Sequence, residues 1–175
     1  MTNTLSPNEM ADKAKQIYQA GDYLEAAQAF AESASAYASS GDAGMSAEMK
    51  NNQSVALLLS GDAQAALEAA EGTETIFAAS NDYRRQGMAL ANMASALEAL
   101  KRRKDAIELY KRASDALEKA NEGDLRADVM QLLATLYLRH FKIYDAVITL
   151  QSGLAGVKNP TAKQRLMKKI LFVRI

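Results

Sequence analysis

Apolar residues recur along the chain at the spacing i, i+1, i+4, i+7 and i+11, which places them on one face of an α-helix. Ala26 and Ala66 each open such a series. Gly-Asp pairs separate the series, and Gly61 with Asp62 lies between two strings of good helix formers. Glycine costs about 1 kcal/mol relative to alanine inside a helix, so a continuous helix through Gly61 is disfavoured. The pattern therefore predicts amphipathic helices joined by short turns.

The break repeats with a period of 40 residues, and internal repeats of this length are typical of solenoids. The aligned segments are GDYLEAA (21–27), GDAQAAL (61–67), KRRKDAI (101–107) and FKIYDAV (141–147). The aligned columns on one helical face include Ala26, Ala66, Ala106, Ala146; Phe30, Ala70, Tyr110, Leu150; and Tyr37, Phe77, Leu117, Val157. A second set of breaks falls midway, at 39–42, 80–82 and 121–124. Glycine or asparagine there suits a left-handed helix end, and aspartate suits the next N-cap.

Each unit is thus predicted to be two helices of about 16 residues, the length of ordinary globular helices. Ser6, Pro7 and Glu9 predict a capped first helix, and a last helix is expected at about 161–174. We expect nine helices in one all-α domain (1–175), with repeats at about 7–40, 41–80, 81–120 and 121–159 and a terminal helix at 160–175. Stacked hairpins of this kind form a right-handed superhelical array whose first helices line a concave face.

Composition agrees with a soluble helical protein, because 49% of residues are apolar, 24% are charged and only two are prolines. The absence of cysteine excludes disulfides and thiolate metal sites. No membrane span or signal peptide is evident, so the expected location is the cytoplasm. Charge is polarised: residues 1–100 carry 5 Lys/Arg and 13 Asp/Glu, whereas residues 101–175 carry 16 and 8. This polarity either steers partners or reflects solvated faces that happen to segregate.

The turn and second-helix segments GDYLEAAQAF and KRRKDAIELYKRA resemble the tetratricopeptide repeat (TPR). The usual TPR unit has about 34 residues. The longer unit here is similar to those of kinesin light chains and soluble NSF attachment proteins, and the resemblance covers residues 7–157. It implies a non-catalytic protein-interaction module whose partner is another protein or a peptide. The motif is specific for the fold and says little about the partner.

Side chains suited to catalysis are scarce. The only histidine, His140, falls in the last turn of a predicted first helix, where a cation is favourable for structural reasons. No metal site, calcium loop or phosphate loop is present in the sequence, so neither an enzyme nor a cofactor is predicted. A run of four basic residues replaces Gly-Asp at the third turn. Together with the other basic residues of the C-terminal half it offers a weaker alternative, phosphate binding: Lys101, Arg102, Arg103, Lys104, Arg112, Lys163, Arg165, Lys168, Lys169. Nucleic acid is unlikely as the partner, because the interleaved aromatic residues used for base stacking are absent.

The family geometry, transferred position by position, predicts the residues that line the concave groove: Ala11, Asp12, Lys15, Tyr18, Asn51, Asn52, Val55, Leu58, Leu59, Met88, Asn92, Ser95, Glu98, Asp128, Gln131, Thr135, Leu138, Arg139. Family members that hold a terminal carboxylate use Lys or Arg at several of these positions. Only Lys15 and Arg139 are basic here, so we expect a groove of amides and apolar side chains. Asn52 and Asn92 share a repeat position and either bind a peptide backbone or bridge neighbouring helices.

The end of the sequence suggests an alternative function as a structural or self-assembling scaffold. Leu166, Met167, Ile170 and Leu171 are predicted to cover the fourth hairpin, while Phe172, Val173 and Ile175 fall largely off that face. An uncovered apolar patch marks an interface, so Phe172 and Ile175 are candidates for homodimer contacts. The opposing interpretation is a frayed end or one that is tucked back against the last hairpin.

Overall fold

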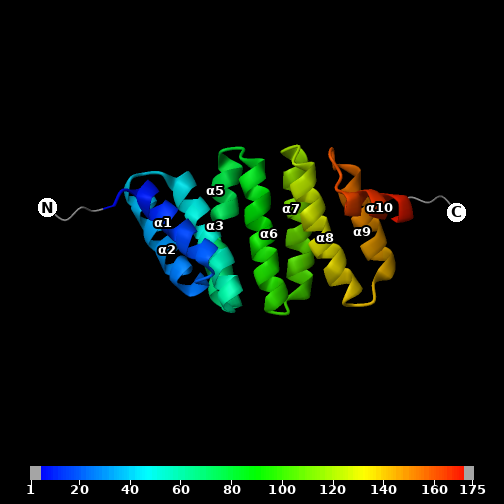
Figure 1. Cartoon of the computed structure of the whole chain (residues 1–175), viewed down its shortest axis with the longest axis horizontal. Helices are drawn as coiled ribbons and strands as arrows, with labels where there is room; N and C mark the ends of the chain where they lie inside the picture. Colours follow the sequence, from blue (N-terminus) through cyan, green and yellow to red (C-terminus); the bar gives the residue numbers. More distant parts are fainter. Residues whose placement is uncertain (1–4, 172–175) are drawn as a thin grey trace.

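The structure, a computed structural model, describes residues 5–171, and every regular element in that range is an α-helix. The helices are α1 (Pro7–Ala20), α2 (Tyr23–Ser39), α3 (Ala43–Ser60), α4 (Ala63–Ala70), α5 (Thr73–Ala79), α6 (Tyr83–Ala99), α7 (Arg103–Lys119), α8 (Gly123–Leu138), α9 (Ile143–Ala155) and α10 (Ala162–Leu171). They form a row of four hairpins with α1 and α10 at opposite ends (Figure 1). The predicted all-α array of four hairpins and a terminal helix is confirmed.

The turns inside the hairpins share one backbone conformation at intervals of 40 residues. Gly21, Gly61, Lys101 and Phe141 all have positive φ angles, of 92°, 97°, 61° and 57°. The turns between hairpins do the same at Gly41, Asn81 and Asn121. The left-handed conformation ends a helix and reverses the chain, and glycine or asparagine adopts it at least cost. The interruption at Gly61 is therefore the turn of the second hairpin.

Side-chain caps begin several helices as expected. Ser6 and Glu9 form the predicted capping box, with Pro7 in the first turn of α1. Asp42 and Asp82 accept hydrogen bonds from the backbone N–H groups of residues 45 and 85, at 2.9 and 3.0 Å. The third predicted cap is wrong: α8 begins after Glu122, so Asp124 lies in its first turn rather than at its N-cap.

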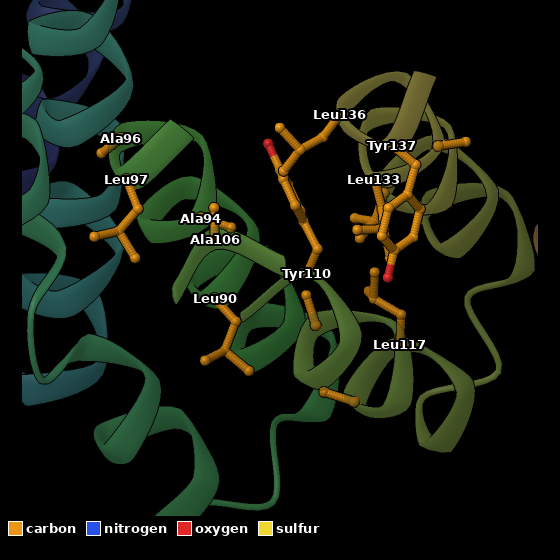
Figure 2. Close-up of a cluster of buried hydrophobic side chains, with 14 of the residues drawn as sticks. Leu90, Ala94, Ala96, Leu97, Ala106, Tyr110, Leu117, Leu133, Leu136 and Tyr137 are labelled. Atoms are coloured by element: carbon orange, nitrogen blue, oxygen red, sulfur yellow. The ribbon is translucent and has the colours of Figure 1, made fainter. Parts of the chain in front are cut away.

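The repeat columns form the core. All four column alanines, Ala26, Ala66, Ala106 and Ala146, are 0% exposed. Small residues at this position let the two helices of each hairpin approach closely. Figure 2 shows the larger side chains of the central cluster, with Tyr110 of α7 lying between Leu97 of α6 and Tyr137 of α8. The cluster thus joins consecutive hairpins into one body.

The second hairpin departs from the expected nine helices, because its second helix is divided into α4 and α5. Gly72 adopts a φ of 79°, which few residues other than glycine tolerate. Thr73 then starts α5, and its hydroxyl donates to the Ala70 carbonyl at 2.7 Å and to Oδ1 of Asn51 at 3.1 Å. Asn51 on α3 therefore helps to hold the break in place.

The terminal helix is covered less than the sequence suggested. In Figure 1, α10 lies across the end of the row rather than along the other helices. Leu166 and Ile170 are 59% and 65% exposed, so the prediction that they cover the fourth hairpin is wrong. Met167 and Leu171 are half-buried, and the Gln151 side chain on α9 donates to the Leu171 carbonyl. The candidate contact residues Phe172 and Ile175, together with Val173, lie outside the described residues.

Candidate functional site

Four predicted groove residues come together in one hollow between α1 and α3. We call it the α1–α3 hollow. It has a volume of about 390 Å³, and it is lined by Lys15, Tyr18, Gln19, Phe30, Glu48, Asn52 and Val55. Lys15, Tyr18, Asn52 and Val55 were predicted from the repeat positions, whereas Gln19, Phe30 and Glu48 were not. The repeat positions predicted residues of the first helices only, and they did not indicate that Phe30 of α2 also lines the hollow.

Aromatic rings form the apolar part of this hollow. Phe30 is only 2% exposed, and the centroid of its ring lies 6.4 Å from that of Tyr18. Tyr18 also lies against Tyr23, with a centroid separation of 5.5 Å. Such tilted ring pairs fix the orientation of Tyr18 before any ligand arrives. The apolar part of the hollow is thus held in place by contacts between rings of α1 and α2.

Some polar side chains at the rim of the hollow already form ion pairs within the protein, and Asn52 does not. Lys15 lies 3.5 Å from Asp12, and Glu48 lies 3.0 Å from Arg85 on α6. Asn52 is half-buried on the wall, where its amide can both donate and accept a hydrogen bond. An amide beside an apolar floor suits a ligand that presents a peptide bond next to an apolar side chain.

Asn51, which was also predicted to line the groove, does not. It is 7% exposed, and Oδ1 accepts the hydrogen bond from Thr73 that stabilises the start of α5. Consecutive helix residues point in directions about 100° apart, so the Asn51 side chain faces α5 while the Asn52 side chain faces the hollow. Of the two neighbouring amides, one is structural and one is available.

Farther along the row, a polar chain links α6, α7 and α8. The hydroxyl of Tyr110 lies 3.1 Å from Ser95 Oγ and donates to Glu98 Oε2 at 3.2 Å. Arg139 donates to the other Glu98 oxygen at 2.6 Å. Burial, reinforced by the negative charge of Glu98, raises the pKa of Tyr110 to about 12. Ser95, Glu98 and Arg139, three predicted groove residues, are thus engaged within the protein: Ser95 contacts Tyr110 inside the third hairpin, and Arg139 joins Glu98 between the third and fourth hairpins.

The remaining predicted groove residues lie along the first helices without joining the α1–α3 hollow. Asn92 and Leu58 are half-buried, Gln131 is exposed and Leu138 is 49% exposed. Thr135 is half-buried, and its hydroxyl donates to the Gln131 carbonyl at 2.8 Å. The α1–α3 hollow therefore gathers four predicted residues from α1 and α3 and none from α6 or α8.

A second hollow, which shares only Glu98 and Arg139 with the predicted groove, lies beside the turns of the third and fourth hairpins. We call it the basic hollow. It has a volume of about 590 Å³, and it is lined by Glu98, Lys101, Arg102, Arg103, Lys104, Asp105, Leu136, Arg139 and His140. The 40-residue repeat could have predicted this hollow. Lys101 and Phe141 are equivalent turn positions of adjacent hairpins, so the residues before them must lie near each other. His140 is exposed in the turn, as expected for a structural position.

Comparison with known proteins identifies the architecture. No family model matches the sequence, and no curated protein matches it. A crystal structure of nearly identical TPR-like repeats from Podosopora anserina, described as those of a kinesin light chain, matches with a TM-score of 0.74. The fold is a TPR-like repeat solenoid. That match has 18% sequence identity and covers 94% of this chain and 82% of the other.

A glutamine-to-methionine variant of the same repeats matches this TPR-like chain with a TM-score of 0.75 at 18% identity. It covers 97% of this chain and 86% of the other. At this identity the likeness establishes the fold and leaves the partner to be argued from the surface. Within residues 5–171, no helix is both long and apolar enough to cross a membrane, and no three His, Asp or Glu side chains gather as a metal site.

Proposed function

We propose that this TPR-like solenoid is a non-catalytic interaction module that binds a peptide segment along its first helices. The observation that carries the proposal is the convergence of Lys15, Tyr18, Asn52 and Val55 around an aromatic floor. An apolar side chain of the peptide enters the α1–α3 hollow, and the adjoining peptide bond pairs with the Asn52 amide. Burial of apolar surface contributes about 25 cal/mol per Å² to such binding, before the cost of association.

The charge of the predicted groove favours this mode over capture of a terminal carboxylate. Its basic members are Lys15 on α1 and Arg139 directly after α8, at distant points of the row. Each is already close to a carboxylate, at 3.5 Å for Lys15 and 2.6 Å for Arg139. A ligand carboxylate would have to compete with Asp12 or Glu98 for these cations. Apolar and amide contacts therefore supply the affinity at this site.

Peptides selected from a displayed random library against the full chain test the proposal. The double variant Asn52→Ala with Asn92→Ala is expected to bind the selected peptides more weakly, because each lost amide contact costs about 0.5–1.5 kcal/mol of binding free energy. The melting temperature should stay nearly unchanged. Gln53→Ala is the matched control, because Gln53 is a half-buried amide on α3 that does not line the hollow. A large fall in melting temperature with unchanged affinity would instead identify structural amides and contradict the proposal.

The second candidate function is self-association through the C-terminal end, favoured by the exposure of Leu166 and Ile170 on α10. Apolar side chains left in water at the end of a solenoid stabilise contact with another surface. Sedimentation should then show an oligomer that dissociates in Leu166→Ser with Ile170→Ser, or in Phe172→Ser with Ile175→Ser. If the unaltered chain runs as a monomer at tens of micromolar, self-association through this end is wrong.

A further inference from the structure

The basic hollow is built by two turns and is separate from the α1–α3 hollow. Its walls come from four consecutive basic residues in the α6–α7 turn and the start of α7, and from Arg139 and His140 in the turn that follows α8. Leu136, only 3% exposed, forms an apolar floor. The volume of about 590 Å³ falls within the range of about 300–1,000 Å³ that is common for ligand sites.

Positive charge exceeds negative charge in this hollow. Its two carboxylates are each paired: Glu98 with Arg139 at 2.6 Å, and Asp105 with Arg102 at 2.9 Å. Lys101, Arg103 and Lys104 line the hollow as well, and they form no ion pair among residues 5–171. The paired carboxylates orient the two arginines, while the three remaining cations leave a net positive field for a ligand.

The basic turn is a poorer choice for the fold than its equivalent in the second hairpin. In the second hairpin, Gly61 takes the left-handed conformation and Asp62 caps α4 by accepting from the Ala65 N–H at 3.0 Å. In the third hairpin, Lys101 takes that conformation with a φ of 61°, and Arg102 at the N-cap position makes no side-chain cap. Both replacements disfavour the turn. Relative to the Gly-Asp pair of the second hairpin, Lys101 and Arg102 therefore add two cations to the hollow at a cost to the turn.

We propose that the basic hollow binds an acidic peptide segment, with Asp or Glu side chains of the ligand inside it. Planar arginine and flexible lysine donors match carboxylates, and the volume admits more than one of them. Next to the hollow, Leu138 is 49% exposed and Phe141 is 90% exposed, which offers apolar contact to a residue beside the acidic ones. Among the residues that line the hollow, none is Phe, Tyr or Trp and His140 is the only one with a ring, so a platform for stacking successive bases is missing and a peptide is favoured over a nucleic acid.

Fluorescence anisotropy with the full chain tests the assignment. The probe is a labelled peptide of glutamates with one central leucine. The comparison peptide has the same sequence with every glutamate replaced by glutamine. The glutamate peptide should bind, and the glutamine peptide should bind at least about tenfold more weakly. Raising NaCl from about 50 to about 300 mM should weaken binding, because exposed charges are screened. Equal binding of the two peptides overturns the proposal, and so does tighter binding of a single-stranded oligonucleotide of equal charge.

A repeat-restoring variant separates binding from folding. Lys101→Gly with Arg102→Asp installs the Gly-Asp pair that the first two hairpins carry at this position. We expect a loss of affinity of about tenfold or more, with a melting temperature equal to or above that of the unaltered chain. The control Lys163→Gln, Lys168→Gln, Lys169→Gln makes the same change in net charge on α10, outside the hollow.

The control should keep its affinity for the glutamate peptide within about twofold, since remote surface charges are largely screened. If the α10 control loses as much affinity as the turn variant, binding comes from the general field of the basic half and the site is wrong. The result is independent of the α1–α3 hollow, because both variants leave that hollow intact.

Discussion

Gly87 fixes how closely α6 and α7 approach. A Cβ atom on Gly87 would lie 2.6 Å from Cγ of Leu117 and 3.1 Å from the carbonyl oxygen of Ala113. Leu117 is 0% exposed, so its side chain has no open space into which to move. Gly44 in α3 provides the contrast, because the nearest atom to its added Cβ is Asp42 Oδ1 at 3.6 Å. The same substitution therefore meets a clash with a packed interface in one helix and an ordinary van der Waals contact in the other.

The two alanine variants should change stability in opposite directions. Alanine stabilises a helix interior by about 1 kcal/mol relative to glycine, and by less near a helix start. Overpacking of a filled core costs about 1–3 kcal/mol. We therefore expect Gly44→Ala to raise the free energy of unfolding by up to about 1 kcal/mol. Gly87→Ala should lower it by up to about 2 kcal/mol, because the clash exceeds the gain in helix propensity.

Urea denaturation followed by circular dichroism measures both effects. The urea concentration at the midpoint of unfolding should rise for Gly44→Ala and fall for Gly87→Ala. The slope of the unfolding free energy against urea concentration should stay constant. If Gly87→Ala is as stabilising as Gly44→Ala, α6 and α7 can move apart without a loss of stability. That result would refute our account of their close approach. The result bears on function, since α6 carries Glu98, which lines the basic hollow.

Three further perturbations test other parts of the structure. Asn51→Ala should destabilise the fold by about 1 kcal/mol through the lost Thr73 contact while leaving peptide affinity unchanged, and an unaltered melting temperature would contradict the structural role of Asn51. The pKa of Tyr110 is raised by burial to about 12, from about 10 when unfolded, so its contribution is fully present below pH 10 and is lost as pH rises through 12. Denaturation at increasing alkaline pH should show that the unaltered chain loses about 2–3 kcal/mol more than Tyr110→Phe, and equal losses would show that the hydroxyl is not held in its neutral form. Lys101→Gly alone should stabilise the third turn by about 1 kcal/mol in thermal melts, and a fall in melting temperature would mean that Lys101 makes a favourable contact there.

Sequence by itself determined the helices, their order and the faces they bury. The alanine column from Ala26 to Ala146 is fully buried because helix periodicity is a local property, which repeats every 40 residues whatever the neighbours are. Gly61 and Asn81 ended helices as expected, because glycine and asparagine adopt the left-handed conformation at least cost. Part of the site followed from the same register, which placed Lys15, Tyr18, Asn52 and Val55 on the exposed side of α1 and α3.

Tertiary structure decided what periodicity leaves open. Asn51 and Asn52 are adjacent and chemically identical, yet only packing against Thr73 made one structural. The basic hollow needed two turns 40 residues apart to meet, so that Arg139 reached Glu98 beside Lys101. The exposure of Leu166 and Ile170 depended on how α10 crosses the end of the row. In each case the deciding energy comes from contacts between helices, whose distances and angles are set by all the side chains at the interface together.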